Sequence, residues 1–288
     1  MALVPPNVDR SAITVAARRV LLDALVALRE HLDALVLVGA QAVYLRSGTL
    51  DLGVAMYTSD GDVGLDPELL RGDPRLEGAL TGAGFTRDIL DRDPQPGTWF
   101  QVVRIDGKDV PIAVDLLAPE SLAAGRRGAD LPPHAKGSVR RVPGIELALE
   151  DHDRMPIASL EPDTDNRSLA MRVAGTSALL VAKAYKIHDR SSDSNARRRG
   201  DKDAADVYRL MATADPFDVA ETFTRLAASP RVGDITRVGL GLLRTQFGAP
   251  RATGVEMAVR ALATSVPEDR IRRNATAFTN ALPMLPEE

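Results

Sequence analysis

The chain contains no cysteine, which excludes disulfide bonds and thiolate metal sites. Its 4 histidines, His31, His134, His152 and His188, are scattered along the 288 residues and do not have the spacing of a zinc site. Aromatic residues make up only 4% of the chain, and Trp99 is the single tryptophan. These absences exclude disulfide-stabilised and thiolate-dependent classes and argue against a zinc enzyme.

Long apolar runs are also missing, since none approaches the roughly 18 residues that a membrane-spanning helix needs. The first residues, Met1–Pro6, do not have the charged and then apolar pattern of a secretion signal. We therefore expect a cytoplasmic protein without membrane contact. The formal net charge of −4 leaves no strongly basic coat for nucleic acid, while 44% hydrophobic residues are sufficient for an ordinary core.

Apolar periodicity predicts that the N-terminal part mixes helices and strands. Residues 11–32 repeat apolar side chains at helical spacing, and 34–38 form a continuous apolar run that is typical of a buried strand. A short helix over 39–46 and a helical stretch over 67–83, interrupted near Gly72-Asp73-Pro74, are also expected. Further β-like runs cover 86–90, 98–105, 110–117, 139–142, 145–149, 155–160 and 169–173. Asp106-Gly107 is a hairpin-turn signal between two of these runs.

The remainder of the sequence is helical in pattern. Residues 191–200 are polar, small and basic and are expected to form a mobile loop between two of the helices. The helical patterns cover 178–190, 201–211, 216–228, 233–246, 253–264 and 268–281. We therefore predict an α+β fold, with a mixed β-sheet and flanking helices in residues 1–174 and a C-terminal helical bundle in residues 175–288.

Asp60 and Asp62 lie two positions apart at the start of an expected strand, so both carboxylates point to the same side. Carboxylates this close repel each other unless a cation lies between them, and hard oxygen ligands suit Mg²⁺. Asp115 is a further acid, embedded in an apolar strand that is able to run beside the first. The alternatives are that Asp60-Gly61-Asp62 is a polar turn and that Asp115 caps a strand end.

Gly39 follows the first expected strand and begins a helix. Backbone N–H groups and the positive end of the helix dipole converge at such a junction, and glycine allows a phosphate to come close. Most junctions of this kind are simply tight turns, and the fuller dinucleotide and P-loop fingerprints are absent. Lys183 and Lys186 lie on a later helix, where each is equally consistent with a solvated side chain.

Together these residues suit nucleotidyl transfer from a nucleoside triphosphate (NTP). Three carboxylates that hold Mg²⁺ are able to activate the attacking oxygen and neutralise the leaving pyrophosphate, while a backbone cradle and a lysine hold the phosphates. Asp60, Asp62 and Asp115 are the candidate metal ligands, and Gly39 is the candidate cradle.

The sequence resembles the AbiEii/MenT-type toxins of the DNA-polymerase-β-like nucleotidyltransferase superfamily. The resemblance depends on four short motifs, in matching order, that span roughly residues 35–210. These are Leu37-Val38-Gly39-Ala40-Gln41-Ala42, Thr58-Ser59-Asp60-Gly61-Asp62, Leu179-Leu180-Val181-Ala182-Lys183 with Arg190, and Lys202-Asp203-Ala204-Ala205-Asp206-Val207. The helices after residue 212 match no motif.

The resemblance implies a role for each matched residue. Asp60 and Asp62 would be the catalytic metal pair, and Thr58 the hydroxyl residue near phosphate. Lys183 would bind the triphosphate from the helical part, and Asp206 would orient Lys183 or the base. Asp203 would support its helix, although Asp203 and Asp206 near a helix start also simply favour the dipole.

Two departures from the family pattern concern the phosphate cradle and the lysine. The family's second glycine is Ala40 here, and Gln41 stands where the family has serine. Lys186, one helical turn from Lys183, competes with it for the triphosphate. The nucleotide-binding set is therefore Gly39, Ala40, Gln41, Thr58, Lys183, Lys186 and Asp203.

The resemblance further implies an RNA acceptor, namely the 3′ end of tRNA, and a cognate antitoxin protein. The acidic net charge means that a local basic patch would have to contact the RNA. Its candidate residues are Arg126, Arg127, Arg140, Arg141 and Arg197–Arg199. Transfer to a small molecule or a protein side chain, and a non-catalytic nucleotide-binding or interaction module, are the alternatives.

Overall fold

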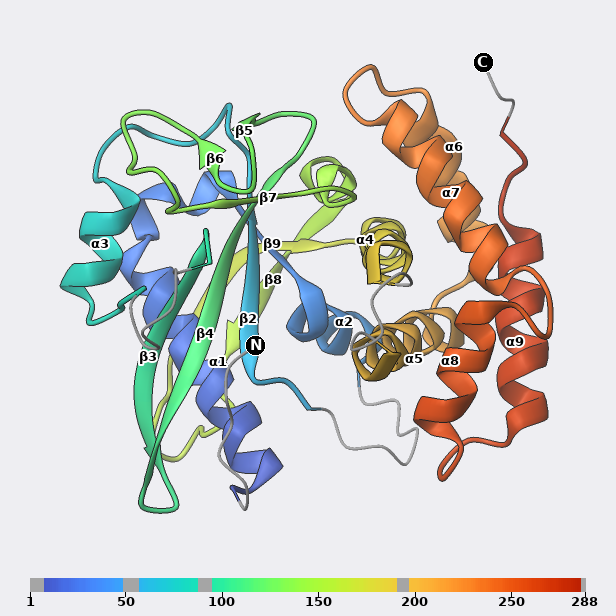
Figure 1. Cartoon of the computed structure of the whole chain (residues 1–288), viewed down its shortest axis with the longest axis horizontal. Coiled ribbons are helices and arrows are strands. Elements are labelled where there is room, and N and C mark those ends of the chain that lie inside the picture. Colours follow the sequence, from blue (N-terminus) through green and yellow to red (C-terminus); the bar gives the residue numbers. More distant parts are fainter. Residues whose placement is uncertain (1–7, 49–56, 88–94, 191–196, 286–288) are drawn as a thin grey trace. The chain divides into compact units, whose positions relative to one another are not determined.

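The structure is a computed structural model that describes residues 8–48, 57–87, 95–190 and 197–285, with only the backbone for 197–200. The chain forms two compact units (Figure 1). Unit 1 comprises Met1–Gln41, Met56–Val142 and Asp153–Val173, and unit 2 comprises Ala42–Ala55, Pro143–His152 and Ala174–Glu288. The predicted α+β class, with a mixed sheet and then helices, is confirmed. No helix in the described ranges is both long and apolar enough to cross a membrane.

Over the described residues, the main sheet has 7 strands, in the order β3-β4-β2-β1-β9-β8, with β7 also paired to β4. Two pairings decide the position of the acids: β2 is parallel to β4 and antiparallel to β1. The strands are β1 (Leu35–Val38), β2 (Asp60–Leu65), β3 (Thr98–Ile105), β4 (Lys108–Pro119), β7 (Arg140–Val142), β8 (His152–Ala158) and β9 (Ser168–Ala174). A separate pair joins β5 (Ala124–Gly125) to β6 (Ala129–Asp130).

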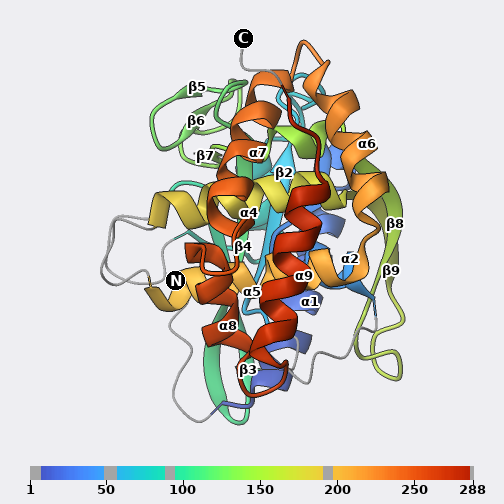
Figure 2. The same ribbon diagram turned by 90° about the vertical axis from the view of Figure 1, so that its right-hand side faces the viewer.

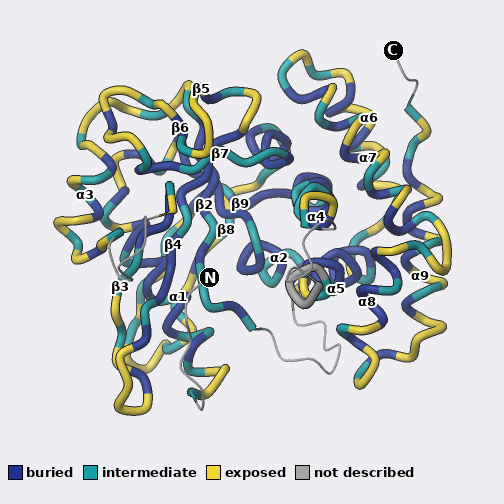
Figure 3. Tube along the Cα trace, in the orientation of Figure 1, coloured by how far each residue is buried: buried dark blue, intermediate teal, exposed yellow. Residues whose placement is uncertain are grey.

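Helix α1 (Arg10–Ala27) covers one face of this sheet. It begins where the Asp9 carboxylate accepts hydrogen bonds from two backbone N–H groups of the first turn, which satisfies donors that a helix start leaves free. Its residues Ile13, Ala17, Leu21 and Leu25, four positions apart, are fully buried. Figure 3 shows buried residues running through this sheet and α1, and also through helices α4 (Thr176–Arg190) and α5 (Arg197–Thr213) of unit 2.

The described part of unit 2 is built mainly of helices, which pack against sequence neighbours and against more distant helices. α4 packs against α5 and α7, and α5 packs against α8 and α9 (Figure 2). These elements are α6 (Pro216–Ala227), α7 (Gly233–Phe247), α8 (Thr253–Leu262) and α9 (Glu268–Ala281). The four helices predicted after residue 212 are thus confirmed to within three residues of their ends.

Several predicted elements differ from the structure. The strand predicted over 145–149 is instead a 3₁₀ helix, η2 (Glu146–Leu149). The buried Glu146 carboxylate accepts a hydrogen bond from the Gly144 N–H at 2.7 Å, a local contact that stabilises a turn at this point. The helix predicted over 67–83 is only α3 (Leu76–Gly82). Helix α5 begins at Arg197, inside the predicted loop, since polarity does not exclude a helix; residues 191–196 lie outside the described ranges.

The other elements predicted before residue 108 agree with the structure in part. The 11–32 helix is divided into α1 and a 3₁₀ helix, η1 (Arg29–Ala34), and α2 (Gly39–Ser47) follows β1 as predicted. The Asp106-Gly107 turn is confirmed, with φ of 50° and 75° at its two residues. Most of the β-like run over 86–90 lies outside the described residues, and Thr86 pairs with Phe100 in an isolated bridge.

Candidate functional site

The pairing of β2 with β4 places the three candidate metal ligands on one face of the sheet. Asp62 lies directly opposite Asp115 in the parallel register, and side chains of opposite residues project to the same side. Asp60 shares this side because it is two positions from Asp62. Gly61, between them, faces Leu21 of α1, whose Cδ1 would lie 3.1 Å from an added Cβ. The acids therefore lie on the face opposite α1.

Hydrogen bonds from two neighbouring side chains fix the start of β2. The buried Thr58 hydroxyl donates to Asp60 Oδ1 at 2.8 Å, which orients this carboxylate. Gln41 Nε2 donates to the Asp60 carbonyl oxygen at 3.0 Å, and its Oε1 accepts from Arg18 Nε at 2.7 Å. Both side chains thus position Asp60, while their predicted contacts with nucleotide stay predictions.

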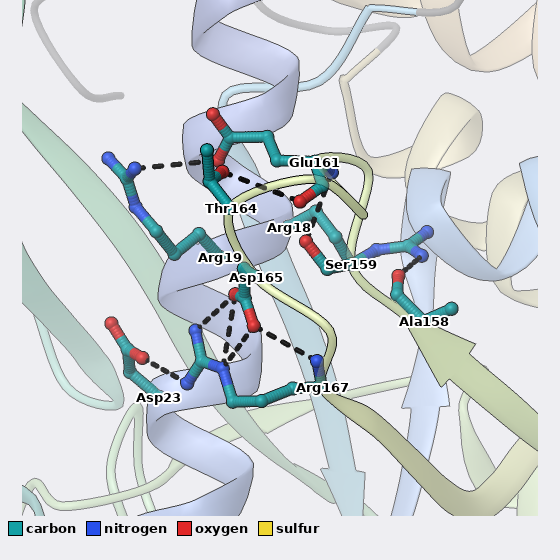
Figure 4. A network of polar contacts seen from close by, with 9 residues as sticks. All are labelled: Arg18, Arg19, Asp23, Ala158, Ser159, Glu161, Thr164, Asp165 and Arg167. Carbon is teal, nitrogen blue, oxygen red and sulfur yellow. Dashed lines mark hydrogen bonds and ion pairs between the residues drawn. The ribbon is translucent and has the colours of Figure 1, made fainter.

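Arg18 extends this positioning network to the end of β8. Its Nη1 donates to the Ala158 carbonyl oxygen at 2.8 Å, and burial lowers the pKa of its guanidinium. In Figure 4 the loop after β8 is also attached to α1 through Arg167, which bonds Asp165 and Asp23 at 2.7 and 2.6 Å. Helix α1, whose Arg18 supports Gln41 and thereby Asp60, is therefore bonded to β8 and to the loop that follows it.

Gly39, the first residue of α2, has the conformation and the space that only glycine allows. Its φ is +70°, in the left-handed region, and an added Cβ would lie 2.0 Å from Asp62 Oδ2. The Asp62 carboxylate thus lies against the N-terminal end of α2, where the helix dipole favours negative charge. Ala40, the next residue, is buried.

Asp115 is held from the other side by an arginine of β7. Arg140 Nη2 donates to Asp115 Oδ2 at 2.7 Å, in a pair whose side chains are only 27% and 15% exposed. The second carboxylate oxygen, Asp115 Oδ1, is buried and has no hydrogen-bond partner. Asp115 therefore combines one neutralised oxygen with one that a cation or a donor would satisfy.

The expected convergence of the three carboxylates is not seen in this structure. Within the described ranges, no three His, Cys, Asp or Glu side chains form a group that could hold a metal ion. The carboxylate of Asp62 lies over Gly39, next to β1, whereas that of Asp115 is bonded to Arg140 on β7. The donor chemistry fits a hard divalent cation, but the coordination itself stays a prediction.

The basic part of the predicted site lies in unit 2, on α4 and α5. Lys183 is buried, and its Nζ donates to Asp203 Oδ1 at 2.8 Å and to Asp206 Oδ2 at 2.6 Å. Arg190 also bonds Asp203, and Lys186 Nζ lies 4.0 Å from the same carboxylate. The residues of the third and fourth sequence motifs thus form one ion cluster.

Electrostatics keep Lys183 and Asp203 charged in spite of their burial. Burial alone would lower the pKa of Lys183, but the attraction of Asp203 and Asp206 outweighs it and holds the pKa above its ordinary value. Burial would raise the pKa of Asp203, yet Lys183, Lys186 and Arg190 lower it to about 2. Lys183 and Asp203 therefore remain ionised across the physiological pH range.

Lys183 and Lys186, the two candidate lysines for binding the triphosphate, differ in exposure and in their contacts. Lys183 is 4% exposed and engaged with two acids, whereas the Lys186 side chain is 38% exposed. Asp206 contacts Lys183 in the manner that the resemblance implies for an orienting acid. Because the acids of β2 belong to unit 1 and both lysines to unit 2, their predicted approach across one cleft stays a prediction.

A hollow elsewhere in unit 1 contains none of the predicted site residues. It has a volume of about 650 Å³ and is lined by residues of α1, η1 and α3, together with Pro74, Gln101 and Arg167. Arg167 is already paired with Asp23 and Asp165. The acids Asp60, Asp62 and Asp115 of β2 and β4 therefore do not line this hollow.

Sequence reasoning missed three residues that contact the acids or their supports. Arg140 was expected only in a basic patch, and neither Arg18 nor Thr98, which is opposite Asp115 on β3, was singled out. Their partners lie 25, 23 and 17 positions away, so no local motif marks them. The available signal for Arg140 was that Asp115, an acid within an apolar strand, requires a cationic partner.

No protein-family model matches the chain. No curated protein matches it. Among solved structures, the chain is similar to an antigenic nucleotidyltransferase-like protein from Paracoccidioides brasiliensis, with 14% sequence identity and a TM-score of 0.33. The match covers 80% of this chain and 94% of that one. At this degree of similarity, function has to be argued from the chain's own residues, and membership of the AbiEii/MenT-type family stays a prediction.

Proposed function

We propose that the chain is a metal-dependent nucleotidyltransferase that moves a nucleoside monophosphate from an NTP to an acceptor hydroxyl. The observation that carries the proposal is the row formed by Asp62 and Asp115, with Asp60 on the same face and Gly39 beside Asp62. Adjacent carboxylates on one face, next to a helix N-terminus, bring metal-binding and phosphate-binding groups together.

The reaction joins the acceptor oxygen to the α-phosphorus, breaks the bond to the β-phosphate and releases pyrophosphate, while the acceptor's proton passes to solvent. Asp60, Asp62 and Asp115 are the residues proposed to hold Mg²⁺. When bound, Mg²⁺ would lower the pKa of the attacking hydroxyl and neutralise charge on the phosphates. Thr58 keeps the Asp60 carboxylate turned toward one position through its hydroxyl.

The N-terminal end of α2 is the proposed contact for the triphosphate. Backbone N–H groups at such a helix end attract anions. The Asp62 carboxylate against Gly39 would repel a phosphate unless a cation lay between them, which links phosphate binding to metal binding. The lysine contact with the triphosphate is taken from the resemblance, with Lys183 as the first choice and Lys186, the more exposed of the two, as its competitor.

For the acceptor we propose RNA, specifically the 3′ end of tRNA, and for the biological setting a toxin with a cognate antitoxin. This part of the proposal depends on the sequence resemblance to the AbiEii/MenT-type toxins. A small molecule or a protein side chain would use the same acids and phosphate contacts, so the assay has to test these acceptors in parallel.

The test uses the purified chain, Mg²⁺, each α-³²P-labelled NTP in turn and total tRNA, a protein extract or small hydroxylated acceptors. We expect label on tRNA, and its loss in Asp60→Asn, which keeps size but removes the charge. Asp109→Asn is the matched control, because Asp109 is an exposed acid paired with Arg104 in the hairpin of the same unit. It should retain transfer.

The possible outcomes identify the acceptor, reject the activity or show that the variant is not specific. Label on protein or on a small molecule would replace RNA by that acceptor and keep the nucleotidyl transfer. If folded protein neither transfers label nor binds any NTP, the proposed activity is wrong and a non-catalytic interaction module remains. Equal loss in the Asp109→Asn control would show that the effect of Asp60→Asn is not specific to the site.

A further inference from the structure

Arg140 occupies the cationic position beside Asp115. Its Nη2 is 2.7 Å from Asp115 Oδ2, and its second guanidinium contact, from Nη1 to Gln95 Oε1, is long at 3.5 Å. An internal guanidinium therefore neutralises the carboxylate that would otherwise attract an external cation. This pair also directs Asp115 toward β7 and away from a common ligand group with Asp62.

Three polar atoms around this pair are buried without a hydrogen-bond partner. They are Asp115 Oδ1, Arg140 Nε and Thr98 Oγ1. Thr98 is 8% exposed and lies directly opposite Asp115 in the antiparallel register, so its hydroxyl is on the same face of the sheet. Buried polar atoms are rarely left unpaired, and three around one ion pair indicate a place for a polar ligand.

We propose that Arg140 is an internal competitor of a divalent cation for Asp115, and that the cation binds there only when Arg140 releases the carboxylate. With Arg140 released, both carboxylate oxygens of Asp115 would become available to a cation beside Asp62, and the unpartnered Thr98 hydroxyl on the same face would be a further oxygen there. Arg140 is thus a positioning residue, and the inference depends on the proposed metal role of Asp115.

The physical basis is the exchange of one cation for another at the same carboxylate. Binding of the metal must first break a charge-assisted hydrogen bond, so the apparent metal affinity is reduced by the stability of the Arg140–Asp115 pair. Removing the guanidinium removes this competition and one positive charge. A purely structural Arg140 would instead change the stability of the sheet and leave metal affinity unaltered.

The test measures Mn²⁺ binding by electron paramagnetic resonance of the free ion, without NTP or acceptor. We expect Arg140→Gln to bind Mn²⁺ about tenfold more tightly than the wild type, the low end for losing a hydrogen bond between charged groups. Arg104→Gln is the matched control, because Arg104 forms an exposed pair with Asp109 in the same unit and carries the same charge. Screening limits its effect to about twofold or less. Asp115→Asn should abolish the gain in the Arg140→Gln background.

Unchanged or weaker Mn²⁺ binding in folded Arg140→Gln would overturn the inference, as would an equal gain in Arg104→Gln. If Arg140→Gln does not fold, the wild type is studied by ¹⁵N NMR instead. The Arg140 Nε–H signal is assigned as the arginine signal that is missing from the spectrum of Arg140→Lys. This signal is then followed while the wild type is titrated with Mg²⁺. Movement of this signal supports competition, and a constant signal refutes it. If Arg140→Gln binds Mn²⁺ more tightly but the chain shows no nucleotidyl transfer, this inference stands and the proposed function is rejected. If the chain transfers nucleotide but Arg140→Gln does not bind Mn²⁺ more tightly, the proposed function stands and this inference is rejected.

Discussion

The close approach of Asp62 to Gly39 predicts that Gly39→Ala is strongly destabilising for two separable reasons. Alanine at a φ of +70° is strained, which costs about 1–2 kcal/mol. Its Cβ would also lie 2.0 Å from Asp62 Oδ2 and 2.7 Å from Asp62 Cβ, so the strand residue must move. Overpacking of this kind typically costs about 1–3 kcal/mol. We therefore expect a total loss of about 2–5 kcal/mol in the free energy of unfolding.

A second glycine separates the strain from the steric conflict. Gly84 has a φ of +84°, and an added Cβ there would meet nothing within 4 Å. Gly84→Ala should therefore cost only the backbone strain of about 1–2 kcal/mol. The difference between the two variants measures the contact of Gly39 with Asp62.

A double-mutant cycle isolates the same contact. Asp62→Gly removes both the carboxylate and the Cβ that the new methyl would meet, so Gly39→Ala should cost less in this background by about 1–3 kcal/mol. Asp62→Ala would be a poorer choice, because it retains the Cβ at 2.7 Å. The coupling is expected to appear only between these two positions and not between Gly84 and Asp62.

The assay is unfolding in guanidinium chloride followed by tryptophan fluorescence. Trp99, the sole tryptophan, is 3% exposed on β3, so its emission reports unit 1 separately from unit 2. Equal losses for Gly39→Ala and Gly84→Ala would refute the steric argument. The argument would also fail if the loss in Gly39→Ala persisted undiminished in the Asp62→Gly background.

Two further predictions concern buried charges and pH. Lys183→Met should lower the free energy of unfolding by about 3–5 kcal/mol, because it leaves Asp203 and Asp206 buried without their shared cation. The measurement is urea-induced unfolding monitored by circular dichroism. A loss below about 1 kcal/mol, as for a surface ion pair, would contradict a buried cluster. Burial lowers the pKa of His134, whose Nδ1 accepts a backbone N–H bond at 3.3 Å. Unit 1 should therefore lose stability as pH falls below about 6.5, where the unfolded chain binds the proton first. His134→Gln should flatten this dependence of Trp99-monitored unfolding, and an unaltered profile would exclude His134 as its source.

Much of the secondary structure was predictable because its signals are local. The α1 pattern, the apolar run of β1 and the turn at Asp106-Gly107 depend on residues at most a few positions apart. The strand predicted over 145–149 was wrong because a short buried segment, with apolar residues on both sides of Glu146, fits a 3₁₀ helix as well as a strand. Local sequence pattern therefore predicted long helices and strands well, but it did not distinguish a short strand from a 3₁₀ helix.

The acids were identifiable from the sequence, but their partners were not. Asp60 and Asp62 share a side of β2 by strand geometry alone. The pairing of Asp115 with Arg140, and of Gln41 with Arg18, joins positions 25 and 23 residues apart and depends on strand order and register. These contacts decide that the carboxylates are directed to different neighbours in this structure.

The sequence by itself determined the α+β class and the helices after residue 212, because these follow from short-range spacing. It also supplied the candidate residues for metal and phosphate chemistry, whose roles stay a prediction. Only the tertiary structure decided that Asp115 lies beside Asp62, that Arg140 neutralises it, and that Lys183 is buried between Asp203 and Asp206. The physical reason is that strand register and helix packing are set by non-local burial and hydrogen bonding, which no short stretch of the chain encodes alone.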